Sequence, residues 1–173
     1  MKATYQASDS SVHPIQMGCY GLGVSRLLAA LVQVNADDRG IVWPRGMSPI
    51  SAMIMVASAP NKPRYWEMRR AAEQLYDHMA QFAPSVGDVI MDDRDATTSV
   101  GERFAHADLI GYEWVVVVGK AWAASAKPGD GSQATSSAND AEEHDFEVQN
   151  RSKTVKRVVR GYAELLKVIG WKN

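Results

Sequence analysis

The sequence predicts an α/β layer fold, in which helices cover a largely parallel or mixed β-sheet. Short apolar runs and amphipathic helical patterns alternate along residues 50–120, and strand–helix alternation is typical of this fold class. The run "WVVVVGK" at residues 114–120 is almost purely β-branched, as in a strand that is covered on both faces. With 173 residues, of which 46% are apolar, the chain is long enough for one domain, or for one domain plus a fragment.

The first 49 residues contain one predicted helix. Residues 1–16 are polar and aperiodic, which predicts a loose leader. Apolar residues recur at helical spacing over residues 24–34. "NADDRG" at residues 35–40 predicts a turn, and two prolines within residues 41–49 indicate a connector that no helix can cross.

The next elements are a strand, a long helix and a second strand. "ISAMIMVAS" at residues 50–58 and "DVIMDD" at residues 88–93 predict the strands. Asn61 is placed to cap the helix between them, with Pro63 near its first turn. The helix is predicted because apolar residues fall at alternating steps of three and four: Tyr65, Met68, Ala72, Leu75, Met79 and Phe82.

Two further elements precede the end of the chain. "SVGERFAHADLIG" at residues 99–111 predicts a helix, in which Ser99 and Glu102 have the spacing of a capping box. Residues 121–141 are rich in Ala, Ser, Gly and Asp and predict a flexible loop. "HDFEVQNRS" at residues 144–152 alternates weakly, as in an edge strand.

The chain is predicted to close with a helix that Gly170 terminates. The residues expected to face inward are Val155, Val158, Val159, Tyr162, Leu165, Leu166 and Ile169.

Charge is balanced overall but unevenly distributed. The net charge is −1, yet residues 151–172 hold seven Lys or Arg against one acid, whereas residues 130–147 hold six acids and no Lys or Arg. Such a basic segment can bind an anionic partner. One cysteine and no metal-ligand spacing among the four histidines argue against a disulfide framework and a zinc site. No run is apolar enough for a membrane span or a signal peptide, so we expect a soluble intracellular protein of the cytoplasm or the mitochondrial matrix.

A stretch with three glycines, "MGCYGLGVSRLLAAL" at residues 17–31, runs into the first predicted helix. Exposed backbone N–H groups and a helix start favour an anion, and Arg26 could grip a phosphate. The stretch lacks the spacing of a Walker loop or a dinucleotide fingerprint. A tight turn packed beneath a helix is therefore the alternative interpretation. Cys19 is interpreted as a passive loop residue rather than a reactive thiolate.

The same stretch resembles motif 3 of class II aminoacyl-tRNA synthetases, in the form found in prolyl-tRNA synthetases. Further segments resemble the same family in order and spacing, so that the resemblance covers about residues 16–120: "RGIVWPRGMSPI", "LYDHM", "VIMDDRD", "VGERFAHADLIG" and "VVVVGK". The resemblance implies that residues 44–173 form the anticodon-binding domain of class IIa synthetases, with a five-stranded mixed sheet flanked by helices. It implies that residues 1–43 are a remnant of the catalytic domain.

The resemblance also implies a function. In the family this domain binds the anticodon stem-loop of the tRNA for proline, and the motif 3 residues that match Gly21, Gly23 and Arg26 contact ATP. Segments corresponding to motifs 1 and 2 are not found in this sequence, so we expect ATP binding and aminoacylation only in a complete enzyme. We expect the missing catalytic domain or a second copy of the chain as a protein partner, and no membrane.

Several residues are candidates for contact with the anticodon. Asp92, Asp93 and Arg94 follow a predicted strand, where α/β sheets tend to place ligand contacts. Arg94 or Arg103 could stack on or hydrogen-bond an unpaired base, or could instead form an acid–arginine pair that stabilises the loop. Lys120 could contact a phosphate or be only solvated.

Two weaker candidates come from the last third of the chain. The basic residues Lys153, Lys156, Arg157 and Arg160 could form a phosphate track on the last helix, or only a solvated face. Trp122, expected in a loop, is a candidate for base stacking. Two alternative functions stay open: an accessory or interaction subunit that uses a similar fold without decoding, and a small nucleotide-binding enzyme built on the glycine loop.

Overall fold

The structure, a computed structural model, describes residues 3–44, 46–81, 88–94, 98–125, 144–151 and 155–170. Its internal contacts divide the chain into two units, Met1–Ala30 and Leu31–Asn173. Helix α1 (Val24–Asn35) begins in the first unit and ends in the second. The described part of the chain contains no helix long and apolar enough to cross a membrane.

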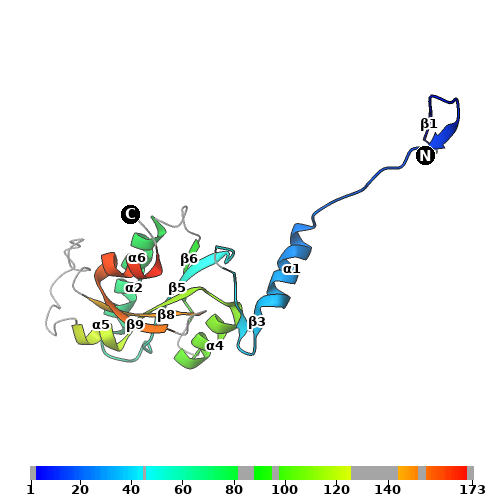
Figure 1. Ribbon diagram of the computed structural model, residues 1–173. Coiled ribbons are helices and arrows are strands. Elements are labelled where there is room, and N and C mark those ends of the chain that lie inside the picture. The colour runs from blue at the N-terminus through cyan, green and yellow to red at the C-terminus, as the bar shows by residue number, and fades with distance from the viewer. Residues whose placement is uncertain are drawn as a thin grey trace. The chain divides into compact units, whose positions relative to one another are not determined.

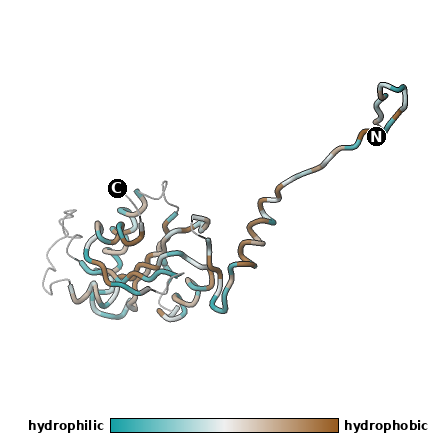
Figure 2. The backbone as a smooth tube through the Cα atoms, in the orientation of Figure 1, coloured by the Kyte–Doolittle hydropathy of each residue, from teal (hydrophilic) through white to brown (hydrophobic). Residues whose placement is uncertain are grey.

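The first unit contains a small hairpin where the sequence predicts a loose leader. Strand β1 (Thr4–Gln6) pairs antiparallel with β2 (Val12–Pro14), and Asp9 accepts a hydrogen bond from the backbone N–H of Ser11 in the turn (3.0 Å). The helix predicted over residues 24–34 is confirmed as α1. Its apolar residues, brown in Figure 2, are not buried.

The second unit is built on a five-stranded mixed sheet in the order β6-β5-β7-β8-β9 (Figure 1). Its strands are β5 (Ile50–Val56), β6 (Asp88–Met91), β7 (Trp114–Val118), β8 (Asp145–Asn150) and β9 (Val155–Arg160). Strands β6, β5 and β7 run parallel, whereas β8 and β9 are each antiparallel to their predecessor. The predicted α/β class with a five-stranded mixed sheet is confirmed.

Helices cover the two faces of this sheet unequally (Figure 1). On one face, α2 (Tyr65–Ala80) and α6 (Gly161–Ile169) form the larger core, together with Trp122 of α5 (Lys120–Ser125). On the other face, α4 (Val100–Ile110) packs its Ala107 and Phe104 onto Met53, Met55, Val115 and Val117. These four partners all come from β5 and β7, so the smaller core lies over the parallel half of the sheet.

The elements that the sequence predicts between residues 50 and 118 are confirmed, with one difference in capping. Ser99 caps α4, because its hydroxyl accepts from the N–H of Glu102 (3.2 Å). Asn61 does not cap α2: the N-cap is Arg64, which has a left-handed backbone (φ 66°). Phe82, predicted to belong to this helix, lies outside the described residues.

The prediction of a helix over residues 155–169 is wrong in its first part. Residues 155–160 form β9, and α6 begins at Gly161, whose positive φ of 72° marks the break between strand and helix. Because side chains alternate along a strand, Val159 is buried whereas Val158 is 54% exposed. Strand β8 is confirmed, but it lies between β7 and β9 and is not an edge strand.

The residues after β7 also differ from the prediction. Lys120–Ser125 form α5 rather than a loop, and Trp122 is only 5% exposed within it. The prediction that Trp122 stacks on a base from a loop is therefore wrong. The rest of the predicted flexible loop, residues 126–141, lies outside the described residues.

A second hairpin joins α1 to the sheet domain. Strands β3 (Ala36–Asp37) and β4 (Gly40–Ile41) are antiparallel, and the predicted turn between them is confirmed. We call residues 36–43 the junction hairpin. The junction hairpin belongs to the second unit, because the division by contacts falls after Ala30. The predicted boundary between the two functional domains, between residues 43 and 44, stays a prediction.

Two leucines of the same domain test the core. Leu75 of α2 is fully buried, whereas Leu109 of α4 is 59% exposed. We expect Leu75→Ala to lower the free energy of unfolding by about 2–5 kcal/mol, because it removes transfer energy and leaves a cavity. Leu109→Ala should change it by less than about 0.5 kcal/mol. Urea titration followed by circular dichroism measures both, and equal effects would contradict this assignment of the core.

Candidate nucleic-acid interface

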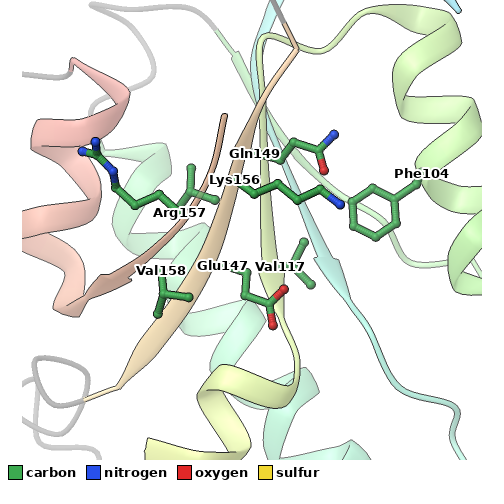
Figure 3. Close-up of a pocket in the computed structure, with 8 residues that line it drawn as sticks. Phe104, Val117, Glu147, Gln149, Lys156, Arg157 and Val158 are labelled. Atoms are coloured by element: carbon green, nitrogen blue, oxygen red, sulfur yellow. The ribbon is translucent and has the colours of Figure 1, made fainter. Parts of the chain in front are cut away.

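The antiparallel half of the sheet carries an open hollow on the face where α4 lies. The hollow has a volume of about 140 Å³, and its lining comes from α4, β7, β8 and β9: Phe104, Val117, Glu147, Val148, Gln149, Lys156, Arg157 and Val158. Figure 3 shows Phe104 on one side and the side chains of β8 and β9 across from it. It exists because α4 covers β5 and β7 but not the outer strands.

The lining of this hollow combines an aromatic ring, a cation and groups that form hydrogen bonds. The Nζ of Lys156 lies over the ring of Phe104, 5.9 Å from its centroid. Glu147 supplies a carboxylate and Gln149 an amide, both from β8. A flat base could stack on the ring and hydrogen-bond to these groups, while the ammonium attracts a phosphate.

The basic residues of the last segment lie differently from the predicted phosphate track. Lys156, Arg157 and Arg160 are in strand β9, so they do not share one helix face as the sequence prediction requires. Arg157 points away from Lys156 in Figure 3. Lys153, the fourth residue of the predicted track, lies outside the described residues.

A second group of charged residues follows β6. The carboxylate of Asp92, whose side chain is 2% exposed, accepts two hydrogen bonds from the guanidinium of Arg94, at 2.9 and 2.7 Å. The guanidinium of Arg103 lies 3.7 Å from the same carboxylate. Burial by itself raises the pKa of Asp92, but the hydrogen bonds from Arg94 and the charge of Arg103 outweigh it, so the pKa lies below its usual value.

Arg94 and Arg103 have different surroundings. Arg103 is buried, and its guanidinium donates to the carbonyl oxygens of Thr98 (3.3 Å) and Arg94 (2.7 Å). Arg94 is partly exposed, and it also contacts the Nδ1 of His106, which must be the acceptor because a guanidinium can only donate. Of the two arginines, Arg94 is therefore the one with a surface that solvent reaches.

A second open hollow, of about 320 Å³, lies beside these residues. Its charged or polar lining includes Asp93, Arg94 and His106, and its apolar lining includes Met53 and Leu109. Both hollows take part of their lining from α4, through Phe104 in the first and His106 in the second.

The structure brings some of the predicted site residues together and separates others. Asp92, Asp93, Arg94 and Arg103 lie in one cluster after β6. Lys120 is exposed at the start of α5, after β7, and β5 lies between these two strands.

The predicted ATP-binding residues Gly21, Gly23 and Arg26 lie in the first unit, and all three are exposed. A Cβ atom at Gly21 would meet nothing within 4 Å, and at Gly23 only the Cβ of Arg26, at 3.5 Å. The local backbone therefore does not itself require glycine at these two positions.

Sequence reasoning missed Phe104, Glu147 and Gln149 as candidate site residues. The signal was present in β8, where residues 145–149 alternate between polar and apolar side chains. Such alternation in a strand that is interior to its sheet means that one of its faces is open to solvent. The described residues contain no group of three or more His, Cys, Asp or Glu that could hold a metal ion.

The fold is that of a part of an aminoacyl-tRNA synthetase. The structure matches a prolyl-tRNA synthetase from Giardia lamblia, solved in complex with prolyl-adenylate, with a TM-score of 0.58. The match covers 79% of this chain and 24% of the Giardia chain. The two sequences are 20% identical, so this match shows the fold alone. No protein-family model matches the chain.

Similarity in sequence identifies the synthetase more closely. A proline–tRNA ligase from Aquifex aeolicus is 38% identical over 159 residues, which are 92% of this chain and 25% of that protein. One from Moorella thermoacetica is 43% identical over 118 residues, which are 68% of this chain and 19% of that protein. The resemblance to prolyl-tRNA synthetases is thereby confirmed: the chain is homologous to one part of these enzymes, and it spans about a quarter or less of the length of these relatives.

The buried carboxylate of Asp92 predicts a pH-dependent contribution to stability. Folding lowers the pKa of Asp92, so the ionised carboxylate stabilises the folded state. This stabilisation is fully present when the pH is above the pKa of an unfolded aspartate, about 4, and it is lost as the pH falls through the lower pKa of the folded state. We expect Asp92→Asn to lower the free energy of unfolding at pH 7 by about 3 kcal/mol, since it leaves the buried Arg103 without this carboxylate.

Urea titrations between pH 3 and pH 7 measure this effect. The difference between Asp92→Asn and the unchanged chain should shrink below about pH 4. Asp93→Asn, at the exposed neighbouring position, is the matched control and should change stability by less than about 0.5 kcal/mol. A difference for Asp92→Asn that stays constant with pH would contradict the assigned ion pairs.

Proposed function

We propose that this chain binds the anticodon region of the tRNA for proline, as the C-terminal part of a prolyl-tRNA synthetase. In this proposal residues 44–173 are the anticodon-binding domain, and the complete enzyme charges proline onto its tRNA with ATP. Support comes from the similarity to proline–tRNA ligases and from the fold. The observation that carries the proposal is the hollow between Phe104 and strands β8 and β9.

The chemistry of this hollow suits an unpaired base better than a duplex. Double-stranded RNA is read mostly by its shape and its backbone, whereas splayed bases stack on aromatic rings and hydrogen-bond at their edges. Phe104 offers the ring, and Glu147 and Gln149 offer acceptor and donor groups beside it. Lys156 provides the positive charge that a nearby phosphate needs.

The cluster after β6 extends this interface in the proposal. Arg94, Asp93 and His106 line the second hollow, and Arg94 has a guanidinium edge that is partly open to solvent. We assign Arg94 and Asp93 to direct contact with the RNA. Arg103 is buried, so we assign it an indirect role, in which it holds the loop that carries Asp92 and Arg94. Lys120 is assigned to a phosphate, because it is exposed at the start of α5, just after the end of β7.

ATP belongs to the same proposal only for the complete enzyme. We assign Gly21, Gly23 and Arg26 to ATP on the basis of the motif 3 resemblance. Their exposure leaves the backbone and the guanidinium accessible to a ligand. We expect this chain alone to give no proline-dependent exchange between ATP and pyrophosphate above background, and a measurable exchange would show that it carries its own catalytic site.

The proposal is tested by binding to a transcript of the tRNA for proline at two salt concentrations, beside the same transcript with a changed anticodon. Loss of affinity on the anticodon change at both salt concentrations is the expected result. Equal, strongly salt-dependent binding to both transcripts would overturn decoding and would favour an accessory or interaction subunit with only a basic patch.

Two variants locate the binding in the hollow. Phe104→Leu keeps an apolar side chain but removes the ring, and we expect roughly a fivefold or greater loss of affinity, since stacking of one base contributes about 1–3 kcal/mol. Lys156→Gln should lower the dependence of log affinity on log salt by about 0.7 to 1.

Each of these variants has a matched control in the same domain. Trp66→Leu removes an exposed ring from α2, and Lys167→Gln removes a charge from α6, and both helices lie on the opposite face of the sheet. Both controls should bind like the unchanged chain. If the controls weaken binding as much as Phe104→Leu and Lys156→Gln do, the RNA does not enter this hollow.

A further inference from the structure

Arg151 is a charged side chain buried where three parts of the second unit meet. Its side chain is 3% exposed, and its two terminal nitrogens donate to both carboxylate oxygens of Asp37, at 3.0 and 2.7 Å. Its Nε donates to the backbone oxygen of Asp108 (3.2 Å) and lies 3.6 Å from the carboxylate of that residue. Arg151 thus connects the end of β8 with the junction hairpin and with α4.

The electrostatics of this contact match its geometry. The hydrogen bonds from Arg151 hold the pKa of Asp37 far below its usual value, and the same contact raises the pKa of Arg151. A buried guanidinium is tolerated where carboxylates and carbonyl oxygens satisfy its fork of donors. Asp37 and Asp108 together supply these acceptors.

Two glycines allow the junction hairpin and α4 to approach each other closely. A Cβ atom at Gly40 would lie 2.4 Å from the Cα of Leu109, and one at Gly111 would lie 2.2 Å from the carbonyl oxygen of Ile41. Both glycines have positive φ angles, of 143° and 81°. Any larger residue at either position would push the hairpin and the helix apart.

A tryptophan closes the same contact. The indole Nε1 of Trp43 donates to the carbonyl oxygen of Ile110 at 3.0 Å, in the last turn of α4. Carbonyl oxygens at the end of a helix have no hydrogen-bond partner within the helix, so the junction hairpin supplies one of the donors that this end of α4 needs. We call the contacts of Asp37, Gly40 and Trp43 with Arg151 and the end of α4 the junction clamp.

We propose that Arg151 is a positioning residue that sets the spacing between the two walls of the hollow beside Phe104. One wall is Phe104, which lies one helical turn before Asp108 in α4. The opposite wall is formed by Glu147 and Gln149 of β8, the strand that ends one residue before Arg151. Arg151 therefore joins both walls, and Asp37 holds its guanidinium in place.

The effect on RNA rests on the proposed function, but the effect on the walls does not. If the clamp loosens, α4 loses the contacts that fix its C-terminal turn, while the core beneath α2 and α6 is untouched. The stacking ring and the hydrogen-bonding groups then no longer keep one fixed separation. A site held by its supporting contacts loses affinity when those contacts are removed, even though no residue that touches the ligand has changed.

The test uses Arg151→Met, which keeps the alkyl stem, with Arg39→Met as the matched control. Arg39 also pairs with Asp108, at 3.5 Å, but its side chain is 39% exposed, so its loss should matter little. Hydrogen exchange should become roughly tenfold or more faster in Arg151→Met at the end of α4 and in the junction hairpin, and should be unchanged in α2. Unchanged exchange at the end of α4 would overturn the proposal.

The RNA readout separates positioning from mere stability. At a temperature at which all variants are folded, Arg151→Met should lower the affinity for the transcript of the tRNA for proline by roughly threefold or more. The same substitution in a Phe104→Leu background should have little further effect, because the ring whose position it controls is already absent. Undiminished affinity of folded Arg151→Met, or a full additional loss in the Phe104→Leu background, would show that Arg151 acts only on stability or elsewhere.

The failure of this inference and the failure of the proposed function give different results. If the unchanged chain does not bind the transcript, the proposed function fails, and hydrogen exchange alone decides whether Arg151 holds the walls. Asp37→Asn provides a second, independent test, since it leaves Arg151 in place but removes the negative charge of its partner. Its exchange pattern should match that of Arg151→Met, and normal protection in Asp37→Asn would show that the clamp does not depend on this pair.

Discussion

The burial of β7 on both faces is the constraint on which the rest of the domain depends. Val115, Val116, Val117 and Val118 are all buried, two toward each core. The strand also divides the sheet, because it is parallel to β5 and antiparallel to β8. Parallel strands need helices on both faces, whereas antiparallel strands can leave one face to solvent. Helix α4 covers the parallel half, and the open half becomes the floor of the hollow beside Phe104.

The charged residues of the domain fall into two classes with different consequences. Arg103 and Arg151 are buried against Asp92 and Asp37, and such pairs fix loops and helix ends in place rather than attract a distant partner. Lys156 and Arg160 are exposed in β9. An anionic partner therefore meets lysine and arginine side chains of the outer strand, while the arginines inside the domain define the shape that it meets.

The sequence was sufficient for the elements whose patterns have one interpretation. The β-branched run of β7 and the regular spacing of Tyr65, Met68 and Leu75 in α2 each fit only one element type. The segment after residue 154 was ambiguous, because its valines fit a helix stripe as well as a strand, and Gly161 gave no local sign that a strand ends there. The contact of Arg151 with Asp37 was beyond sequence reasoning, since 114 residues separate the two.

The assignment of residues 155–160 to a strand changes how the proposed RNA binding has to be explained. A basic stripe along a helix could follow several phosphates, and its affinity would come mainly from the release of counterions. A strand divides its cations between two faces, as Lys156 and Arg157 show in Figure 3, so few of them can face one partner. With a net charge of −1 for the whole chain, nonspecific attraction is weak. In the proposed function, selectivity for the RNA therefore comes mainly from stacking and hydrogen bonds, in the hollow beside Phe104 and at the exposed edge of Arg94. The contacts inside the hollow beside Phe104 depend on the separation of its walls.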